Sequence, residues 1–178
     1  MSESELHFGW FVPTAGDSAR PGISEALVPP SLELFTRIAR AAEDASFEYL
    51  LVPVQTYCWD AYMSCAMIAA RTERIAPLLA ARCGFIAPTV MAKMLSTLDQ
   101  LTQGRVKINL IAGGSAAELA ADGMYYAHDE RYEVMDETVS IMKQAWTTPG
   151  KFDYDGKFYQ IKGGQVEPKP FQSPYPPF

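Results

Sequence analysis

Residues 47–54 read F-E-Y-L-L-V-P-V, a run that is almost entirely apolar. A strand of this kind is buried on both faces, which is typical of a parallel sheet covered by helices. Similar runs occupy residues 6–12 (L-H-F-G-W-F-V), a segment around 78–83, and residues 106–111 (V-K-I-N-L-I). Apolar residues at helical spacing lie between these runs and predict helices over 31–46, 61–71 and about 88–104. The alternation predicts an α/β protein with a parallel sheet.

Local signals mark where the helices begin. Ser31 and Asp60 are placed to cap the helices that follow them, and Pro88 fits the first turn of the third helix. Ser115-Ala116-Ala117-Glu118 is a capping box for a short helix, and a longer helix over about 129–146 follows it. The predicted buried stripes of the third helix and of this long helix are Val90, Met94, Leu98 and Leu101, and Met135, Val139, Met142 and Trp146.

The last thirty or so residues have a different pattern. Residues 152–161 (F-D-Y-D-G-K-F-Y-Q-I) are two alternating runs around Asp-Gly, which predicts a β-hairpin. The prolines after it, at 168, 170, 174, 176 and 177, predict an extended tail that cannot be helical.

Two architectures fit the alternation of strands and helices: a doubly wound sheet and a (β/α)8 TIM barrel. A dinucleotide-binding sheet would need G-x-G-x-x-G after its first strand, whereas residues 13–17 read P-T-A-G-D. The strand centres are about 33 residues apart, so eight units would need about 264 residues, close to the ~250 typical of a barrel. The 178 residues hold about four such units. If the fold is a barrel, we expect this chain to be its N-terminal half, with residues 1–147 as four βα units and 148–178 as hairpin and tail in a single domain.

The composition excludes several classes of function. A net charge of -6 and a pI near 4.9 disfavour binding to nucleic acid or to anionic membranes. No apolar run is long enough to span a bilayer, and the acidic residues 1–5 do not resemble a signal peptide. The three cysteines, at 58, 65 and 83, show no C-x-x-C spacing, so we expect no metal site, no disulfide framework and a cytoplasmic location.

In a parallel barrel the functional site lies at the carboxyl ends of the strands. This rule selects polar and reactive residues that lie in the later part of each predicted strand or directly after it. They are Thr14 and Asp17; Gln55, Thr56, Tyr57 and Cys58; Arg82, Cys83 and Phe85; Asn109, Gly113, Gly114 and Ser115; and, before the long helix, His128, Arg131 and Tyr132.

Each candidate also has a structural interpretation. Cys58 fits either an inert apolar residue or a reactive thiol near a helix N-terminus, whereas Cys65 and Cys83 fit packing. Asn109 lies inside an apolar strand, where a buried amide needs a hydrogen-bond partner or a ligand. Arg82 needs a partner charge, and a structural ion pair is the favoured interpretation. Ser115 is first a helix cap whose neighbouring N–H groups could receive an anion, and His128 either helps to cap the long helix or faces a ligand. These patterns alone leave the activity open.

Longer strings carry a family resemblance. They are W-F-V-P-T with G-D (10–17), Y-C-W-D-A (57–61), A-P-T-V-M-A-K (87–93), T-L-D-Q-L with G-R (97–105), N-L-I-A-G (109–113), D-G (122–123), H-D-E-R-Y-E (128–133) and P-Y-P-P (174–177). In this collinear order, over about residues 7–177, the chain resembles the bacterial luciferase-like flavin-dependent monooxygenases, and most of all their alkanesulfonate monooxygenase branch.

The resemblance implies a TIM barrel that binds reduced FMN at its C-terminal mouth. The FMN would be delivered by a separate NAD(P)H-dependent flavin reductase, and the flavin would use oxygen to oxidise an alkanesulfonate, a sulfone or a related small organosulfur compound. Cys58 matches a cysteine that helps to stabilise the oxygenated flavin in that branch. Asn109 matches an asparagine near the flavin ring, and Tyr132 a tyrosine near the flavin phosphate. His128 and Arg131 belong to the same string, and we include His128 and Ser115 among the cofactor-binding candidates.

The sequence also departs from that branch. Ala15 stands where a histidine typically follows Pro-Thr, and the chain stops where the family continues into a fifth strand. Three hypotheses therefore stay open: an FMN-dependent monooxygenase that acts as a homo-oligomer, a non-catalytic fragment or partner subunit of that family, and a deazaflavin-dependent oxidoreductase. If the four units stand alone, we expect aggregation or the pairing of two half-barrels, because sheet edges would be open.

Overall fold

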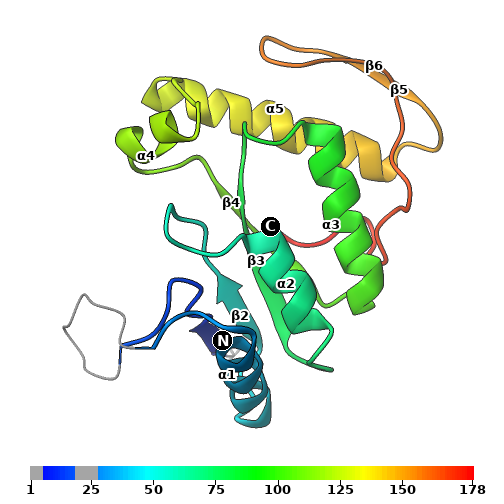
Figure 1. Cartoon of the computed structure of the whole chain (residues 1–178). Coiled ribbons are helices and arrows are strands. Elements are labelled where there is room, and N and C mark those ends of the chain that lie inside the picture. Colours follow the sequence, from blue (N-terminus) through cyan, green and yellow to red (C-terminus); the bar gives the residue numbers. More distant parts are fainter. Residues whose placement is uncertain (1–5, 19–27) are drawn as a thin grey trace, which may run out of the picture. The chain divides into compact units, whose positions relative to one another are not determined.

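The computed structural model describes residues 6–18 and 28–178, so the acidic start of the chain and part of the first loop lie outside the described residues. The elements, in chain order, are β1 (Gly9–Phe11), α1 (Leu32–Asp44), β2 (Tyr49–Val52), α2 (Ala61–Ala69), β3 (Ala76–Arg82), α3 (Pro88–Thr102), β4 (Lys107–Ile111), α4 (Ala116–Ala121), α5 (His128–Thr147), β5 (Phe152–Asp155) and β6 (Gln160–Gly164) (Figure 1). The chain divides into two compact units, Met1–Ala80 and Ala81–Phe178.

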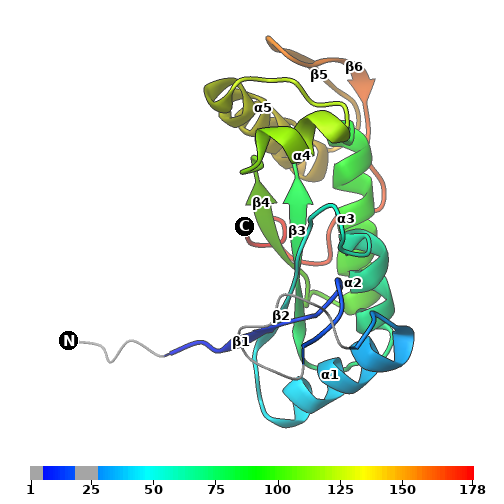
Figure 2. The same cartoon turned by 60° about the vertical axis from the view of Figure 1, so that its left-hand side comes forward.

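The strands confirm the predicted α/β class and the (β/α)8 barrel family. They form one parallel sheet in the order β1-β2-β3-β4, and a separate antiparallel pair joins β5 to β6. Figure 2 shows β3 and β4 side by side with their arrows in the same direction. Strands that stay next to their sequence neighbours, with a helix after each, are the expected start of a barrel.

In the first unit, the parallel register places Gly9 opposite Tyr49 and Val52 opposite Leu79. Gly9 is required here, because a Cβ atom at that position would overlap the Tyr49 ring. Both predicted caps are present: the Ser31 hydroxyl accepts a hydrogen bond from the N–H of Leu34 (3.1 Å), and the Asp60 carboxylate accepts one from the N–H of Met63 (2.8 Å). The local signals therefore fix the starts of α1 and α2 as predicted.

In the second unit, α3 packs against α5, and the indole N–H of Trp146 donates to the carbonyl oxygen of Ala92 at 3.0 Å. The buried stripes predicted for these helices are partly wrong. Val90 and Leu101 are 50% and 71% exposed, whereas the buried faces contain polar residues. On α3 these faces consist of Pro88, Met91, Ala92, Leu95, Ser96, Leu98, Asp99 and Thr102, and on α5 of Arg131, Val134, Thr138, Ile141, Met142, Ala145 and Trp146.

The buried polar residue Asp99 of α3 has a hydrogen-bond partner that lies far away in the sequence. The carboxylate of Asp99, which is fully buried, accepts hydrogen bonds from the backbone N–H and the side-chain Nε2 of Gln172, both at 2.8 Å. The same Nε2 donates to the carbonyl oxygen of Val106. The tail is thus extended, as predicted, and it is held against α3 through a buried carboxylate.

The hairpin forms where it was predicted, but its turn is longer than Asp-Gly. Residues 156–159 connect β5 to β6, and the N–H groups of Lys157, Phe158 and Tyr159 donate to the carboxylate of Glu137 on α5 at 2.7–3.1 Å. The longer turn thus places three backbone N–H groups on one carboxylate of α5. In the part of the chain that the structure describes, no helix is long and apolar enough to cross a membrane.

Candidate functional site

The strand ends of the first unit bring two predicted site residues into one region. The N–H of Trp59 donates to the carbonyl oxygen of Thr14 at 3.0 Å, which joins the segment after β1 to the loop that carries Cys58. Thr14 is fully buried and its hydroxyl oxygen has no hydrogen-bond partner among the described residues. Cys58 is half-buried and not in a disulfide. The other candidates of these loops, Asp17, Gln55, Thr56 and Tyr57, are exposed.

The other two cysteines are packing residues, as expected. Burial raises the pKa of the Cys83 thiol to about 12. Burial, together with the negative charge of Asp60, raises the pKa of the Cys65 thiol still further. Neither thiol is ionised near neutral pH, so Cys58 is the thiol that is available for chemistry.

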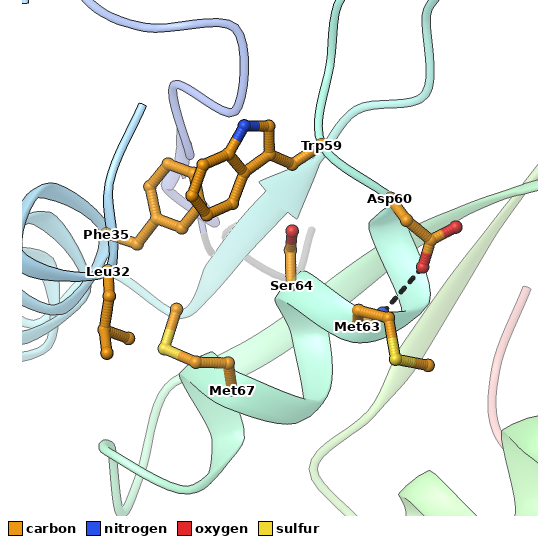
Figure 3. A pocket seen from close by; sticks show the side chains of 7 residues that line it. All are labelled: Leu32, Phe35, Trp59, Asp60, Met63, Ser64 and Met67. Atoms are coloured by element: carbon orange, nitrogen blue, oxygen red, sulfur yellow. Dashed lines mark hydrogen bonds between the residues drawn. The ribbon is translucent and has the colours of Figure 1, made fainter. Parts of the chain in front are cut away.

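The first unit also contains an apolar cleft of about 520 Å³ between α1 and α2 (Figure 3). In this view the rings of Phe35 and Trp59 meet edge to face, with centroids 5.1 Å apart, above the side chains of Met63 and Met67. Leu32, Asp60 and Ser64 complete the lining. This cleft was not predicted from the sequence. The available signal was that α2 has no charged residue over its whole length, so apolar side chains such as Met63 must also face outward.

In the second unit, Asn109 lies on β4 and is half-buried rather than buried as predicted. Its side-chain amide makes no hydrogen bond to any residue that the structure describes. An amide that is partly withdrawn from water and lacks a protein partner is suited to receive hydrogen bonds from, or donate them to, a bound molecule.

Arg82, at the end of β3, forms the predicted ion pair. Its guanidinium contacts the carboxylate of Glu118 at 2.8 Å and that of Asp122 at 3.4 Å. The Ser115 hydroxyl accepts a hydrogen bond from the N–H of the same Glu118 (3.3 Å), so Ser115 is the N-cap of α4, as predicted. The structure thereby links Arg82 to Ser115 through one residue.

The start of α5 brings together two more predicted residues. The rings of His128 and Tyr132 lie 5.2 Å apart between centroids, both are exposed, and the His128 Nδ1 is 2.8 Å from the carboxylate of Asp129. The residue before the helix, Ala127, has no side chain that can cap the first turn, and its backbone N–H donates to the carboxylate of Glu130 at 2.9 Å. Such a helix start favours an anion, although the first-turn carboxylates Asp129 and Glu130 oppose it.

The segment before α5 and the residues after β3 line a cleft of about 650 Å³ that was not predicted from the sequence. Its lining consists of Gly84, Phe85, Asp122, Gly123, Met124, Tyr125 and Tyr126. The guanidinium of Arg131, on α5, is buried and donates to the carbonyl oxygen of Tyr126 at 3.1 Å. The aromatic residues Phe85, after β3, and Tyr125 and Tyr126, before α5, were visible in the sequence, but their convergence depends on the loop conformation.

A protein family and several solved structures match nearly the whole of this chain. The family model described as luciferase-like monooxygenase matches residues 6–178. DmoA from Hyphomicrobium sulfonivorans is 25% identical, with a TM-score of 0.74 over 93% of this chain and 45% of its own. The riboflavin lyase RcaE, solved with modified FMN and riboflavin, is 19% identical, with a TM-score of 0.83 over 97% of this chain and 49% of its own. An F420-dependent secondary alcohol dehydrogenase, solved with an F420-acetone adduct, is 17% identical, with a TM-score of 0.73 over 92% of this chain and 49% of its own.

The chain therefore spans about half the length of the solved structures that it matches.

Proposed function

The chain belongs to the luciferase-like monooxygenase family, and from that premise we propose that it contributes the reduced-FMN site of a two-component monooxygenase. The observation that carries the proposal is the half-buried amide of Asn109 on β4, which has no hydrogen-bond partner among the residues that the structure describes. RcaE, of the same fold, was solved with modified FMN.

The residues present fit a flavin in two respects. Asn109 offers both a donor and an acceptor, as the pyrimidine edge of a flavin ring requires. The start of α5, with His128 and Tyr132, offers backbone N–H groups and side-chain donors for the flavin phosphate. Ser115 is a weaker candidate, because its hydroxyl already caps α4.

When it is bound, reduced FMN supplies two electrons to oxygen, so that one oxygen atom enters the substrate and the other leaves as water. We propose a catalytic role for Cys58 in the first unit. The half-buried thiol follows β2, and the loop that carries it is fixed by the hydrogen bond from Trp59 to Thr14. Asn109, His128 and Tyr132 bind and orient the flavin.

For the substrate we propose an alkanesulfonate, a sulfone or a related small organosulfur compound. The carbon–sulfur bond of a sulfonate would break to give an aldehyde and sulfite. Support for this class comes from the strings shared with the alkanesulfonate branch, above all Y-C-W-D-A and H-D-E-R-Y-E. Ala15, in place of the histidine typical of that branch, is a departure from it, because alanine cannot transfer a proton at that position.

The test is a coupled assay with the chain, FMN, NADH and an NADH-dependent flavin reductase, in which sulfite and aldehyde are measured for a panel of alkanesulfonates and sulfones. Sulfite release that depends on both the chain and the reductase supports the proposal, and Asn109→Leu should abolish it. Gln160→Leu, on the exposed hairpin strand β6, is the matched control and should leave the rate unchanged. Aldehyde and sulfite from no member of the panel would contradict the organosulfur class.

A second candidate function is hydride transfer with a deazaflavin. It is favoured by the similarity to the F420-dependent alcohol dehydrogenase. Parallel titrations of the chain with FMN and with F420 separate the two, because tighter binding of F420 would contradict the FMN proposal.

A third candidate is a partner subunit. β1 is an edge strand of the four-stranded sheet, and Phe8, Trp10 and Phe11 in and beside it are each more than half exposed. Apolar side chains on an edge strand favour cover by another polypeptide, which would also produce the homo-oligomer that we propose. Light scattering after size-exclusion chromatography tests this candidate: a stable monomer would contradict it, and Trp10→Glu should weaken any assembly.

A further inference from the structure

The segment that leads into α5, residues 122–127, is held at both ends by buried arginines. We refer to it as the connector. Asp122, its first residue, contacts the guanidinium of Arg82, and the carbonyl oxygen of Tyr126 accepts a hydrogen bond from Arg131. The two arginines are only 9% and 7% exposed. Burial of two long cationic side chains is costly unless they are paired, so their position needs an explanation.

Arg82 acts on more than the connector. Its second carboxylate partner, Glu118, lies on α4, and the Phe85 ring lies 5.7 Å from its guanidinium carbon. One planar guanidinium thus joins the end of β3 to α4, through Glu118, and to the residue that follows α4, Asp122. A forked group of this kind fixes direction as well as distance, which a lysine cannot do.

Two glycines allow the same segment to pack closely onto the strand ends. Gly113, after β4, has a φ of +90°, and a Cβ atom there would lie 2.6 Å from Leu119 of α4. Gly84, after β3, has a φ of +93°, and a Cβ atom there would overlap the side chain of Met124 in the connector. Leu119 and Met124 are both buried. The position of α4 and the connector is therefore set by apolar contacts to the two strand ends and by the charge of Arg82.

We propose that Arg82 is a positioning residue for the flavin phosphate: through Glu118 and Asp122 it holds the connector so that α5 starts where His128 and Tyr132 can bind the phosphate. Arg131 holds the other end of the connector. This inference rests on the flavin site proposed above.

The first readout needs no flavin. Hydrogen exchange of the backbone amides in Arg82→Met should become at least about tenfold faster in the connector than in the wild-type chain, because both carboxylate contacts are lost. The amides of β4 should keep their protection. Arg82→Lys should restore part of the protection, because it keeps the charge without the fork. Equal exchange in the connector of wild type and Arg82→Met would overturn the inference.

The second readout separates positioning from general stability. FMN and riboflavin differ only in the phosphate, so a displaced α5 start should lower FMN affinity by about tenfold, which is the loss of one charge-assisted hydrogen bond. Riboflavin affinity should change by less than about twofold. Arg105→Met is the matched control: Arg105 is also partly buried, but it donates to Thr102 at the end of α3 and should affect neither ligand.

The outcomes distinguish the two proposals. If the wild-type chain prefers FMN to riboflavin and Arg82→Met keeps that preference, the role of Arg82 is refuted while the flavin site stands. If the wild-type chain shows no preference for FMN, the proposed phosphate site fails, and the role of Arg82 fails with it.

Discussion

The two units hold their strand ends in different ways. In the first unit, the loops after β1 and β2 are joined by a backbone hydrogen bond from Trp59 to Thr14, and the adjoining cleft is lined mainly by apolar and sulfur-containing side chains. In the second unit, the corresponding segments are held by Arg82 and Arg131, with carboxylate and carbonyl partners. Apolar contacts tolerate small shifts, whereas hydrogen-bonded charges specify one arrangement. The second unit therefore has the more precisely fixed strand ends, which suits the residues proposed to bind the flavin.

The largest expected effect is a loss of stability when the apolar packing of the first unit is disturbed. Phe35→Ala removes a ring that is 1% exposed and packs edge to face with Trp59. We expect a loss of about 4 kcal/mol in the free energy of unfolding, from lost burial and the cavity that remains. Urea denaturation monitored by circular dichroism measures it. Phe8→Ala, at a site that is 61% exposed in the same unit, is the control and should cost less than about 1 kcal/mol. Equal losses in the two variants would show that the packing of Phe35 does not stabilise this unit.

A smaller loss of stability is expected when a buried polar contact of the second unit is removed. Asp99→Ala leaves the backbone N–H and the side-chain Nε2 of Gln172 without their carboxylate partner. We expect a loss of about 3 kcal/mol, because buried donors remain unsatisfied. The neighbouring Gln100→Ala removes only an exposed hydrogen bond to the carbonyl oxygen of Lys169 and should cost about 0.5 kcal/mol. The same denaturation measurement applies, and similar values for the two variants would refute the anchoring role of Asp99.

The smallest expected effect concerns an arrangement that occurs in both units. In each, the carboxylate of a glutamate accepts hydrogen bonds from three successive backbone N–H groups. In the first unit this is Glu43, which binds the N–H groups of Glu73, Arg74 and Ile75. Burial raises the pKa of Glu43, but these N–H groups, with the charge of Arg74, outweigh it, and the net pKa lies below the ordinary value of 4.5.

A lowered pKa in the folded state means that this contribution is complete above pH 4.5 and is lost as the pH falls through the folded-state value. Glu43→Gln should therefore cost about 1 kcal/mol at pH 7, and the difference from wild type should shrink below pH 4.5. Unfolding midpoints measured across this range provide the check. A difference that grows on acidification would have the wrong sign for this account.

The sequence predicted the order of the elements well, because each one depends on local signals. Ser31 and Asp60 cap their helices as expected, and Arg82 has the partner charge that its burial required. The buried faces of α3 and α5 were harder to predict. Asp99 is buried because Gln172, 73 residues later, returns to meet it, and no local periodicity contains that contact.

The candidate site was predictable in part, for the same reason. The rule that sites lie at the carboxyl ends of parallel strands selected Asn109, His128 and Tyr132, and the structure places the last two together. The rule did not predict that Asn109 would be only half-buried, nor the cleft along the connector. The cleft depends on the positive φ angle at Gly84 and on the side chain of Met124, which packs where a Cβ atom of residue 84 would lie.

The most direct test of the central claim, a flavin site in the second unit, is a calorimetric titration of the chain with FMN and with riboflavin. We predict that the wild-type chain binds FMN at least about tenfold more tightly than riboflavin, that Tyr132→Phe reduces this preference, and that Asn109→Leu weakens the binding of both ligands equally. Equal affinities of the wild-type chain for the two ligands, or no binding of either, would contradict the account.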